Sequence, residues 1–243
     1  MLSSTPSLTN LNVLKPFIDA NGLVDYNGLK EDKWLHEQVL KLKTADLHGM
    51  SYSEEYAFWL NAYNILTLKG VFMELERNPN WSGNISFLQR VKFFYLRRFS
   101  IAGKKINLYN LENKILRKRF KDPRIHFAIN CGSKSCPNLP DNLFTPETLV
   151  DYLTTLTSSF INDKDHVFLD VKSKTLFLNP IFKWYKKDFQ IKGGVKEFIL
   201  NYLENPEKSF IQIFKSAKIE YTKYDWELNS QDTGSLLKID VIK

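Results

Sequence analysis

The sequence DPRIHFAINCGSKSCPNL, residues 122–139, holds both cysteines of the chain and one of its four histidines. The apolar run from Ile125 to Ile129 is typical of a strand, and Gly132 begins a small polar loop that stops at Pro137. A strand that ends in a glycine turn can expose a sulfur nucleophile, and backbone N–H groups in the loop can face a developing oxyanion. We therefore expect the functional site here.

Cys131 is the stronger of two candidate nucleophiles, and His126 is the candidate base. A free thiol is mostly protonated at neutral pH, and a nearby imidazolium lowers its pKa. Two residues five apart on an unbroken strand point to opposite faces. The pair can share one pocket only if the chain bulges near Asn130, or if Cys131 already lies in the loop. Cys136 has the even spacing from His126 but lies next to Pro137, and it remains the alternative reactive thiol.

The composition is that of an ordered protein with one large domain. The chain has 243 residues, of which 43% are hydrophobic and 14% aromatic, so it can bury a core without a disulfide or a metal. Two cysteines make no disulfide framework, and their spacing is not that of a zinc site. We predict no metal and no cofactor. No apolar run approaches the ~18 residues of a membrane span, so no transmembrane segment is expected.

The charge is concentrated in one part of the chain. The formal net charge is +7, and twelve of the 34 Lys and Arg residues lie between Arg90 and Arg124, with only two acids among them, Glu112 and Asp122. This favours either an ordinary solvated face or an anionic partner. No nucleic-acid-binding motif accompanies the charge, so we expect no nucleic acid.

The strongest helical pattern runs over Glu54–Phe72, with Ser53 as the expected cap. Apolar residues occupy nearly every face, so the helix should be central and buried. Asn61 within it must find hydrogen-bond partners, and either ties down neighbouring backbone or faces the site. On a second predicted helix, Leu108–Phe120, Glu112 lies on the apolar face, where an acid is either paired or functional.

The remaining pattern predicts an α+β fold in which the central helix packs on an antiparallel sheet. The expected strands are His126–Asn130, the Val167–Leu178 hairpin and Ile219–Trp226, with another hairpin over Phe99–Leu108. A single domain should cover residues 11–229, with loose termini at 1–10 and 230–243.

Five segments in order together resemble the family catalogued as domain of unknown function 547. They are Ala57–Asn64, Leu111–Arg117, Asp122–Pro137, Ile181–Phe189 and Tyr224–Asn229. The resemblance implies a fold similar to papain-like and transglutaminase-like cysteine hydrolases. Its bacterial members are commonly exported, which implies the periplasm or cell surface after signal removal, with the cytoplasm left open.

In that interpretation Cys131 is the nucleophile, His126 the base, and Glu112 or Asn61 the group that orients the imidazole. The expected function is a thiol-dependent hydrolase or acyl transferase that acts on an amide or ester of a peptide or of an anionic, cell-wall-like polymer. The expected substrate-binding residues are Asn61, Trp59, Asn130, Ser133, Cys136 and Trp184. The alternative is a non-catalytic binding module whose two cysteines are disulfide-bonded or buried. The sequence predicts no oligomeric state.

Overall fold

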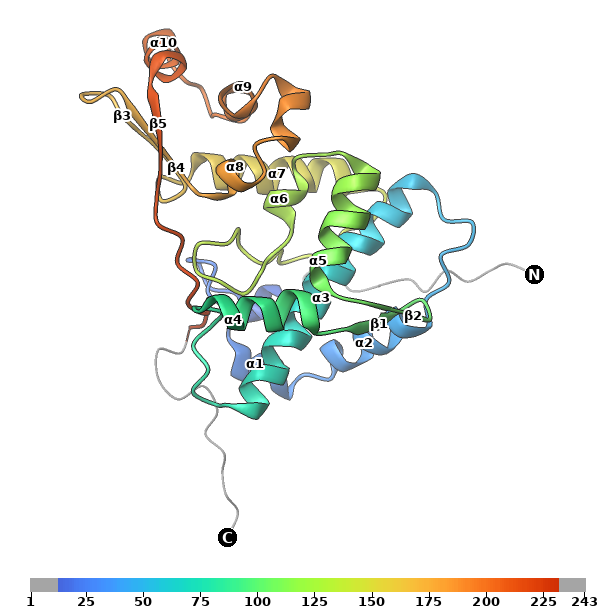
Figure 1. The fold of residues 1–243 in the computed structure, drawn as a ribbon. Coiled ribbons are helices and arrows are strands. Elements are labelled where there is room, and N and C mark those ends of the chain that lie inside the picture. The colour runs from blue at the N-terminus through green and yellow to red at the C-terminus, as the bar shows by residue number, and fades with distance from the viewer. Residues whose placement is uncertain (1–12, 232–243) are drawn as a thin grey trace.

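Helix α3, Tyr52–Arg77, runs through the middle of the molecule (Figure 1). The computed structural model describes residues 13–231. The helix begins after Ser51, not Ser53, because the Ser51 hydroxyl accepts the Glu54 N–H while the Glu54 carboxylate accepts the Ser51 N–H. Nearly every side chain from Tyr56 to Leu75 is buried, so the predicted central buried helix is confirmed.

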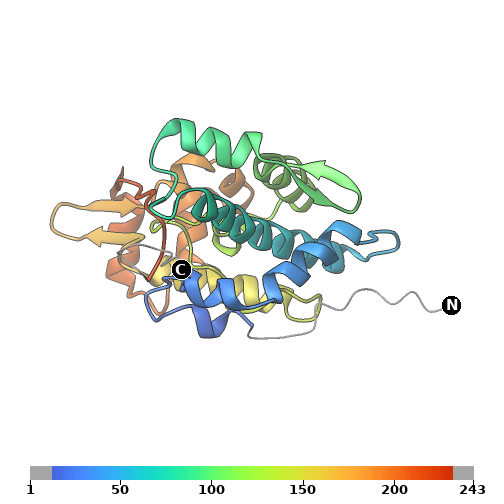
Figure 2. The ribbon, with the colours of Figure 1, turned by 90° about the horizontal axis from the view of Figure 1, so that it is seen from below.

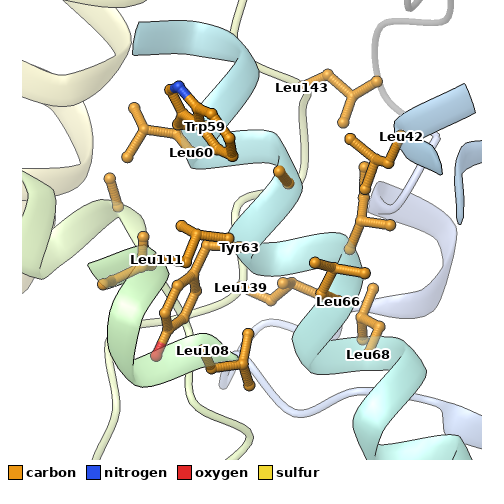
Figure 3. Packing of buried hydrophobic residues seen from close by; sticks show 14 of the residues in the cluster. Leu42, Trp59, Leu60, Tyr63, Leu66, Leu68, Leu108, Leu111, Leu139 and Leu143 are labelled. Atoms are coloured by element: carbon orange, nitrogen blue, oxygen red, sulfur yellow. The ribbon is translucent and has the colours of Figure 1, made fainter. Parts of the chain in front are cut away.

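Helices, and not a sheet, cover α3. Helix α2, Trp34–Thr44, and the π-helix η3, Leu111–Phe120, both pack against it (Figure 2). Figure 3 shows Tyr63 pointing toward Leu108 and Leu111. The expected packing of the central helix on an antiparallel sheet is therefore wrong. Because α3 is apolar on almost all sides, its pattern did not indicate what kind of element covers it.

The strands form two small sheets. β1, Phe99–Ile101, and β2, Lys104–Ile106, make the expected hairpin, which turns at Ala102–Gly103. In the second sheet the strand order is β3, Val167–Asp170, β4, Thr175–Leu178, and β5, Lys218–Tyr221.

The second sheet lies at the edge of the molecule, beside α10 and away from α3 (Figure 1). The predicted hairpin over Val167–Leu178 is confirmed, with Val167 opposite Leu178. β5 is shorter than the predicted strand Ile219–Trp226, and it pairs with β4 in parallel. The expectation of an all-antiparallel sheet was wrong, because β5 returns to β4 through the helices of the C-terminal part.

The predicted strand His126–Asn130 is a short helical turn, α6, Ile125–Ala128. The Asp122 carboxylate accepts the Arg124 N–H at 3.0 Å, and the next three N–H groups bond to carbonyls three residues back. A short apolar run cannot by itself distinguish a buried helical turn from a buried strand. Here Asp122 and Pro123 begin the helical turn, because the Asp122 carboxylate accepts the first free N–H group.

The other elements are short helices that connect these parts. They are η1, Lys15–Phe17; α1, Tyr26–Glu31; α4, Phe87–Arg90; η2, Val91–Leu96; α5, Leu108–Asn110; α7, Leu149–Asn162; α8, Ile181–Trp184; η4, Asp188–Lys192; α9, Val195–Leu200; and α10, Lys208–Ser216. None of the helices in residues 13–231 is long and apolar enough to cross a membrane.

The buried apolar residues form two clusters, a first core around α3 and a second core built mainly from residues after Phe160. Phe127 of α6 belongs to the second core, although its neighbours Ile125 and Ala128 belong to the first. α6 therefore lies where the two cores meet.

The end of the described chain returns to its beginning. Val24 N–H bonds to Asn229 O at 2.8 Å, and Gln231 N–H bonds to Val24 O at 3.1 Å. Residues 230–231, at the start of the expected loose tail, are therefore paired with Val24. The rest of that tail, 232–243, and the expected loose start, 1–10, lie outside the described residues.

Candidate functional site

A cavity of about 350 Å³ is lined by residues of both cores. The first core contributes residues of α3, η2, η3 and α6, and the second contributes α8 and the segment 224–226. His126, Cys131 and Glu112 all line this cavity. The structure thus brings the three predicted catalytic residues to one site.

Cys131 lies in the loop after α6, where Gly132 has a φ of +78° and lets the chain turn. Its Sγ lies 3.4 Å from Ser133 Oγ and 3.2 Å from the Tyr224 hydroxyl, and its N–H donates to Cys136 Sγ at 2.9 Å. Burial raises the pKa of Cys131, but hydrogen bonds from Cys136, Ser133 and Tyr224 outweigh it and lower the pKa to about 7. A large fraction of this thiol is therefore ionised at neutral pH.

Cys136 differs from Cys131 in its environment. Both thiols are free, but Cys136 is buried and Cys131 is only partly so. Burial, and then the neighbouring Cys131 sulfur, raise the pKa of Cys136 well above its ordinary value. Since the thiolate is the nucleophile, these environments favour Cys131 as the reactive thiol, as the spacing argument also did.

His126 Nε2 lies 2.8 Å from Asp188 Oδ2, and its ring stacks on Tyr185 at 3.8 Å. Arg117 holds the same carboxylate with two hydrogen bonds, of 2.6 and 3.0 Å. Burial raises the pKa of Asp188, but hydrogen bonds from His126 and Arg117 bring it well below its usual range. Asp188 is therefore a carboxylate paired with the Arg117 guanidinium.

The His126 imidazole is neutral. Burial lowers its pKa, and the opposing hydrogen bond to Asp188 does not compensate. Because Asp188 can only accept, Nε2 carries the proton, and Nδ1 keeps the lone pair that a general base needs. Within the described residues nothing hydrogen-bonds to Nδ1.

Glu112 does not orient the imidazole. Its Oε2 lies 3.5 Å from the Tyr63 hydroxyl, its Oε1 is buried with no hydrogen-bond partner, and it makes no hydrogen bond to His126. The sequence analysis expected Glu112 or Asn61 to orient the His126 imidazole. In the structure the residue that hydrogen-bonds to this imidazole is Asp188. The reason is that η3 directs Arg117, and not Glu112, toward η4, where Asp188 lies.

His126 and Cys131 are five residues apart and would point to opposite faces of an unbroken strand. They are not on one strand, because His126 lies in α6 and Cys131 lies in the loop that follows it. Both residues reach the cavity. No hydrogen bond joins them among residues 13–231, and the hydrogen-bond partners of the Cys131 sulfur are Cys136, Ser133 and Tyr224. The two residues are therefore shown to share a cavity but not to be in contact.

Of the six predicted substrate-binding residues, Cys136 and Trp184 line the cavity, and the other four, Asn61, Trp59, Asn130 and Ser133, do not. The Asn61 side chain donates to Phe144 O at 2.8 Å and accepts the Phe144 N–H at 2.9 Å. Asn61 therefore ties down neighbouring backbone and does not face the cavity. Trp59 donates its indole N–H to Glu55 at 3.2 Å. Both side chains serve the packing of α3.

Asn130 and Ser133 build the loop that carries the thiol. The Asn130 side chain donates to Pro137 O at 2.7 Å and accepts the Gly132 N–H at 2.8 Å, and its backbone N–H bonds to Asn64. Ser133 is buried next to Cys131. The N–H groups of Cys131 and Gly132 are both bonded, so they are not free oxyanion donors.

Trp184 lines the cavity in an aromatic group with Tyr224 and Trp226. Its ring lies 4.8 Å from Tyr224 and 5.8 Å from Trp226, and the Arg90 guanidinium lies 4.7 Å over Trp226. The segment that carries Tyr224 and Trp226 is held by Leu228 N–H, which donates to Ser82 O at 2.8 Å.

Sequence reasoning missed Asp188 and Tyr224 as site residues. Both belong to the aromatic–acidic segments Ile181–Phe189 and Tyr224–Asn229, which we interpreted mainly as structural. Their recurrence in the family resemblance was the only available signal.

The basic region contributes little to the cavity. Of its twelve Lys and Arg residues only Arg90 is a lining residue, while Arg117 and Arg124 pair with Asp188 and Asp122. In the part of the chain that the structure describes, no group of three His, Cys, Asp or Glu side chains could hold a metal ion.

Comparison with known proteins gives one match. No curated protein and no solved structure matched the chain. The model of a family described as "Protein of unknown function, DUF547" matches residues 47–161, a stretch that includes Glu112, His126 and Cys131. Asp188 and Tyr224 lie beyond it. Residues 47–161 of this chain are therefore a DUF547 family domain.

Proposed function

We propose that the protein is a thiol-dependent hydrolase or acyl transferase acting on an amide or ester. Cys131 is the nucleophile, His126 carries the proton, and Asp188 holds the imidazole. The observation that carries this proposal is a thiol with a pKa of about 7 and a neutral, carboxylate-bound imidazole on the wall of one cavity. A substrate in the cavity would touch both groups.

The residues divide the reaction into two steps. In the first, the Cys131 sulfur bonds to the carbonyl carbon, the thiol proton goes to Nδ1 of His126, and His126 passes it to the departing amine or alkoxide as that bond breaks. In the second, water or an acceptor amine or alcohol gives its proton to His126 and attacks the thioester. The proton then returns to the released Cys131 sulfur.

The oxyanion formed in both steps needs a hydrogen-bond donor close to the sulfur. The hydroxyls of Ser133 and Tyr224 lie 3.4 and 3.2 Å from Sγ, whereas the neighbouring loop N–H groups are already bonded. Tyr224 lines the cavity and therefore takes the role expected of backbone donors, whereas Ser133 is buried beside the sulfur and supports the thiolate.

The proposal has three further parts. The fold is related to that of papain-like and transglutaminase-like hydrolases, the protein is exported from the cytoplasm, and its substrate is an anionic, cell-wall-like polymer. What supports them is the combination of a cavity thiol with an imidazole–carboxylate pair, the family resemblance, and the basic region outside the cavity. Fractionation of cells that express the full natural gene tests export, because an exported protein should be recovered outside the cytoplasm.

The experiment that tests the activity compares the labelling rate of Cys131 by iodoacetamide with that of free cysteine at pH 7, together with hydrolysis of a panel of aryl thioesters. We expect faster labelling than free cysteine and measurable turnover, both lost in Cys131→Ala. Cys136→Ala serves as the thiol control: labelling should remain at Cys131, at a lower rate because this variant removes one of the hydrogen bonds that lower the Cys131 pKa. Slow labelling, together with no property changed in Cys131→Ala, contradicts the proposal.

A binding module without catalysis is the competing function. The lack of a hydrogen bond between Cys131 and His126 favours it, as does the aromatic lining of the cavity. The disulfide that we had considered for this alternative is not formed, since both thiols are free. Ligand binding that survives in Cys131→Ala without any turnover would identify this function.

A further inference from the structure

Glu112 is a buried acid that forms no ion pair with any residue that the structure describes. The residue is 8% exposed, Oε1 has no hydrogen-bond partner, Oε2 accepts from the Tyr63 hydroxyl at 3.5 Å, and Tyr185 also hydrogen-bonds to the side chain. A buried acid with one unsatisfied oxygen and no cationic partner is costly. Such a group on a cavity wall indicates that a ligand completes it.

The cations near the cavity are committed elsewhere. Arg117, on the same helix, bonds to Asp188 and Asn113. Arg90 donates to the backbone oxygens of Asn84 and Ile85 and stacks on Trp226. His126 is neutral because burial lowers its pKa. Lys114, also on η3, is exposed, and Glu112 forms no ion pair within the described residues.

The walls beside Glu112 are aromatic. Tyr63, Tyr95, Tyr109 and Tyr185 line the cavity, and Tyr95 stacks on Tyr109 at 4.3 Å. The faces of such rings carry negative potential and attract organic cations. A carboxylate within a set of tyrosine rings is a chemical environment for an ammonium group.

We propose that Glu112 and these four tyrosines form a subsite for an alkylammonium group. A metal ion does not fit as well, since no group of three metal-binding side chains occurs among residues 13–231. For substrate specificity the inference rests on the proposed function: because Cys131 lines the same cavity of about 350 Å³, the acyl donor would be a short chain with a carbonyl at one end and an ammonium at the other. The cavity thus selects a cationic group, although the outer surface of the chain is basic.

Binding of three ligands of equal chain length tests the inference without any turnover. Isothermal titration of the whole protein with n-hexylammonium, n-hexanol and hexanoate should show hexylammonium binding at least tenfold more tightly than the other two. Glu112→Gln should reduce that preference at least tenfold. The matched control Glu147→Gln, an exposed acid that does not line the cavity, should leave it unchanged.

A second variant protects the test against a folding defect in Glu112→Gln. Tyr109 is 38% exposed, so Tyr109→Leu should fold, and it should weaken hexylammonium binding several-fold more than hexanol binding. The inference is overturned if hexylammonium does not bind, or if hexanol or hexanoate binds as tightly in the wild type.

Thioesters of 6-aminohexanoic acid and of hexanoic acid separate this inference from the proposed function. A tenfold or greater preference in kcat/KM for the aminohexanoyl compound, lost in Glu112→Gln, supports both. Selective hexylammonium binding with no turnover of either thioester supports the subsite and contradicts the enzyme. Equal turnover of both compounds, with no ammonium-selective binding, supports the enzyme and overturns the subsite.

Discussion

His126 Nε2 and Asp188 Oδ2 lie 2.8 Å apart although 62 residues separate them in the chain. The first residue comes from α6, where the two cores meet, and the second begins η4 in the C-terminal part. Arg117 of η3 completes the group with two hydrogen bonds to the same carboxylate. This group therefore connects the DUF547 family domain with residues outside the matched stretch.

Replacing Asp188 should reduce stability at neutral pH and flatten its dependence on acid. We expect Asp188→Asn to lower the free energy of unfolding by about 2 kcal/mol at pH 7, because it leaves charge-assisted hydrogen bonds of Arg117 and the bond of His126 incomplete. The pKa of Asp188 is lower in the folded protein than in the unfolded chain. The ionised Asp188 side chain therefore stabilises the folded protein at pH values above about 3.9, the pKa of the carboxyl in the unfolded chain. This stabilisation is lost as the pH falls toward the pKa of Asp188 in the folded protein.

Urea denaturation at pH 7 and pH 3 measures both effects. The wild type should lose more stability between these two values than Asp188→Asn does. Asp165→Asn, at an exposed position, should follow the wild type. Equal acid losses in the wild type and Asp188→Asn would mean that the pairing contributes nothing.

The reactivity of Cys131 should rise around pH 7. A pKa of about 7 means that the alkylation rate reaches half its maximum near pH 7, compared with about 8.5 for an ordinary thiol. Tyr224→Phe removes a hydroxyl 3.2 Å from the sulfur and should shift the profile to higher pH. Stopped-flow alkylation between pH 5 and 10 measures the profile, and Tyr221→Phe, outside the cavity, is the control. An unshifted midpoint in Tyr224→Phe would contradict the assigned hydrogen bond.

Phe127 should be a major stabilising residue of the second core. It is fully buried, and its ring lies 5.0 Å from that of Phe160 and 5.8 Å from that of Phe198. Phe127→Ala should cost about 3–5 kcal/mol, from lost burial and the cavity left behind. Phe168→Ala removes the same side chain at a position that is 46% exposed, and it should cost less than about 1 kcal/mol. Thermal unfolding compares the two, and similar losses would refute the placement of Phe127.

Gly83 should resist substitution because of the chain that passes over it. A Cβ at this position would lie 2.4 Å from Trp226 O and 2.6 Å from Leu228 N, and φ is +120°. Gly83→Ala should cost about 3 kcal/mol or more, from the left-handed backbone and the steric clash together.

The matched control for Gly83 is Gly103. It has a φ of +72° but open space around it, so Gly103→Ala should cost only about 1 kcal/mol. Since the displaced segment 226–228 lies two residues beyond Tyr224, Gly83→Ala should also slow the alkylation of Cys131, and Gly103→Ala should not. Unfolding curves and alkylation rates of both variants measure this, and equal behaviour would contradict the close approach of segment 226–228.

Much of the local structure was predictable because local pattern decides it. The all-round apolar run predicted the buried helix α3, and alternating residues around a polar turn predicted the β3–β4 hairpin. The Cys and His of residues 122–139 indicated the site, because few other residue types supply a nucleophile and a base. The run Ile125–Ile129 was misassigned because a short apolar segment fits a buried helical turn as well as a strand.

The sequence by itself determined the chemistry-bearing residues Cys131 and His126, the central helix, and the glycine turn that exposes the thiol. Only the tertiary structure decided that Asp188 holds the imidazole, that Tyr224 and Ser133 hydrogen-bond to the thiol, and that Oε1 of Glu112 is left without a hydrogen-bond partner. The physical reason is the distance along the chain between the residues that interact. Helix periodicity and turns depend on neighbours a few residues apart, whereas the pKa of a buried group depends on whichever distant side chains the packing of the two cores brings into contact with it.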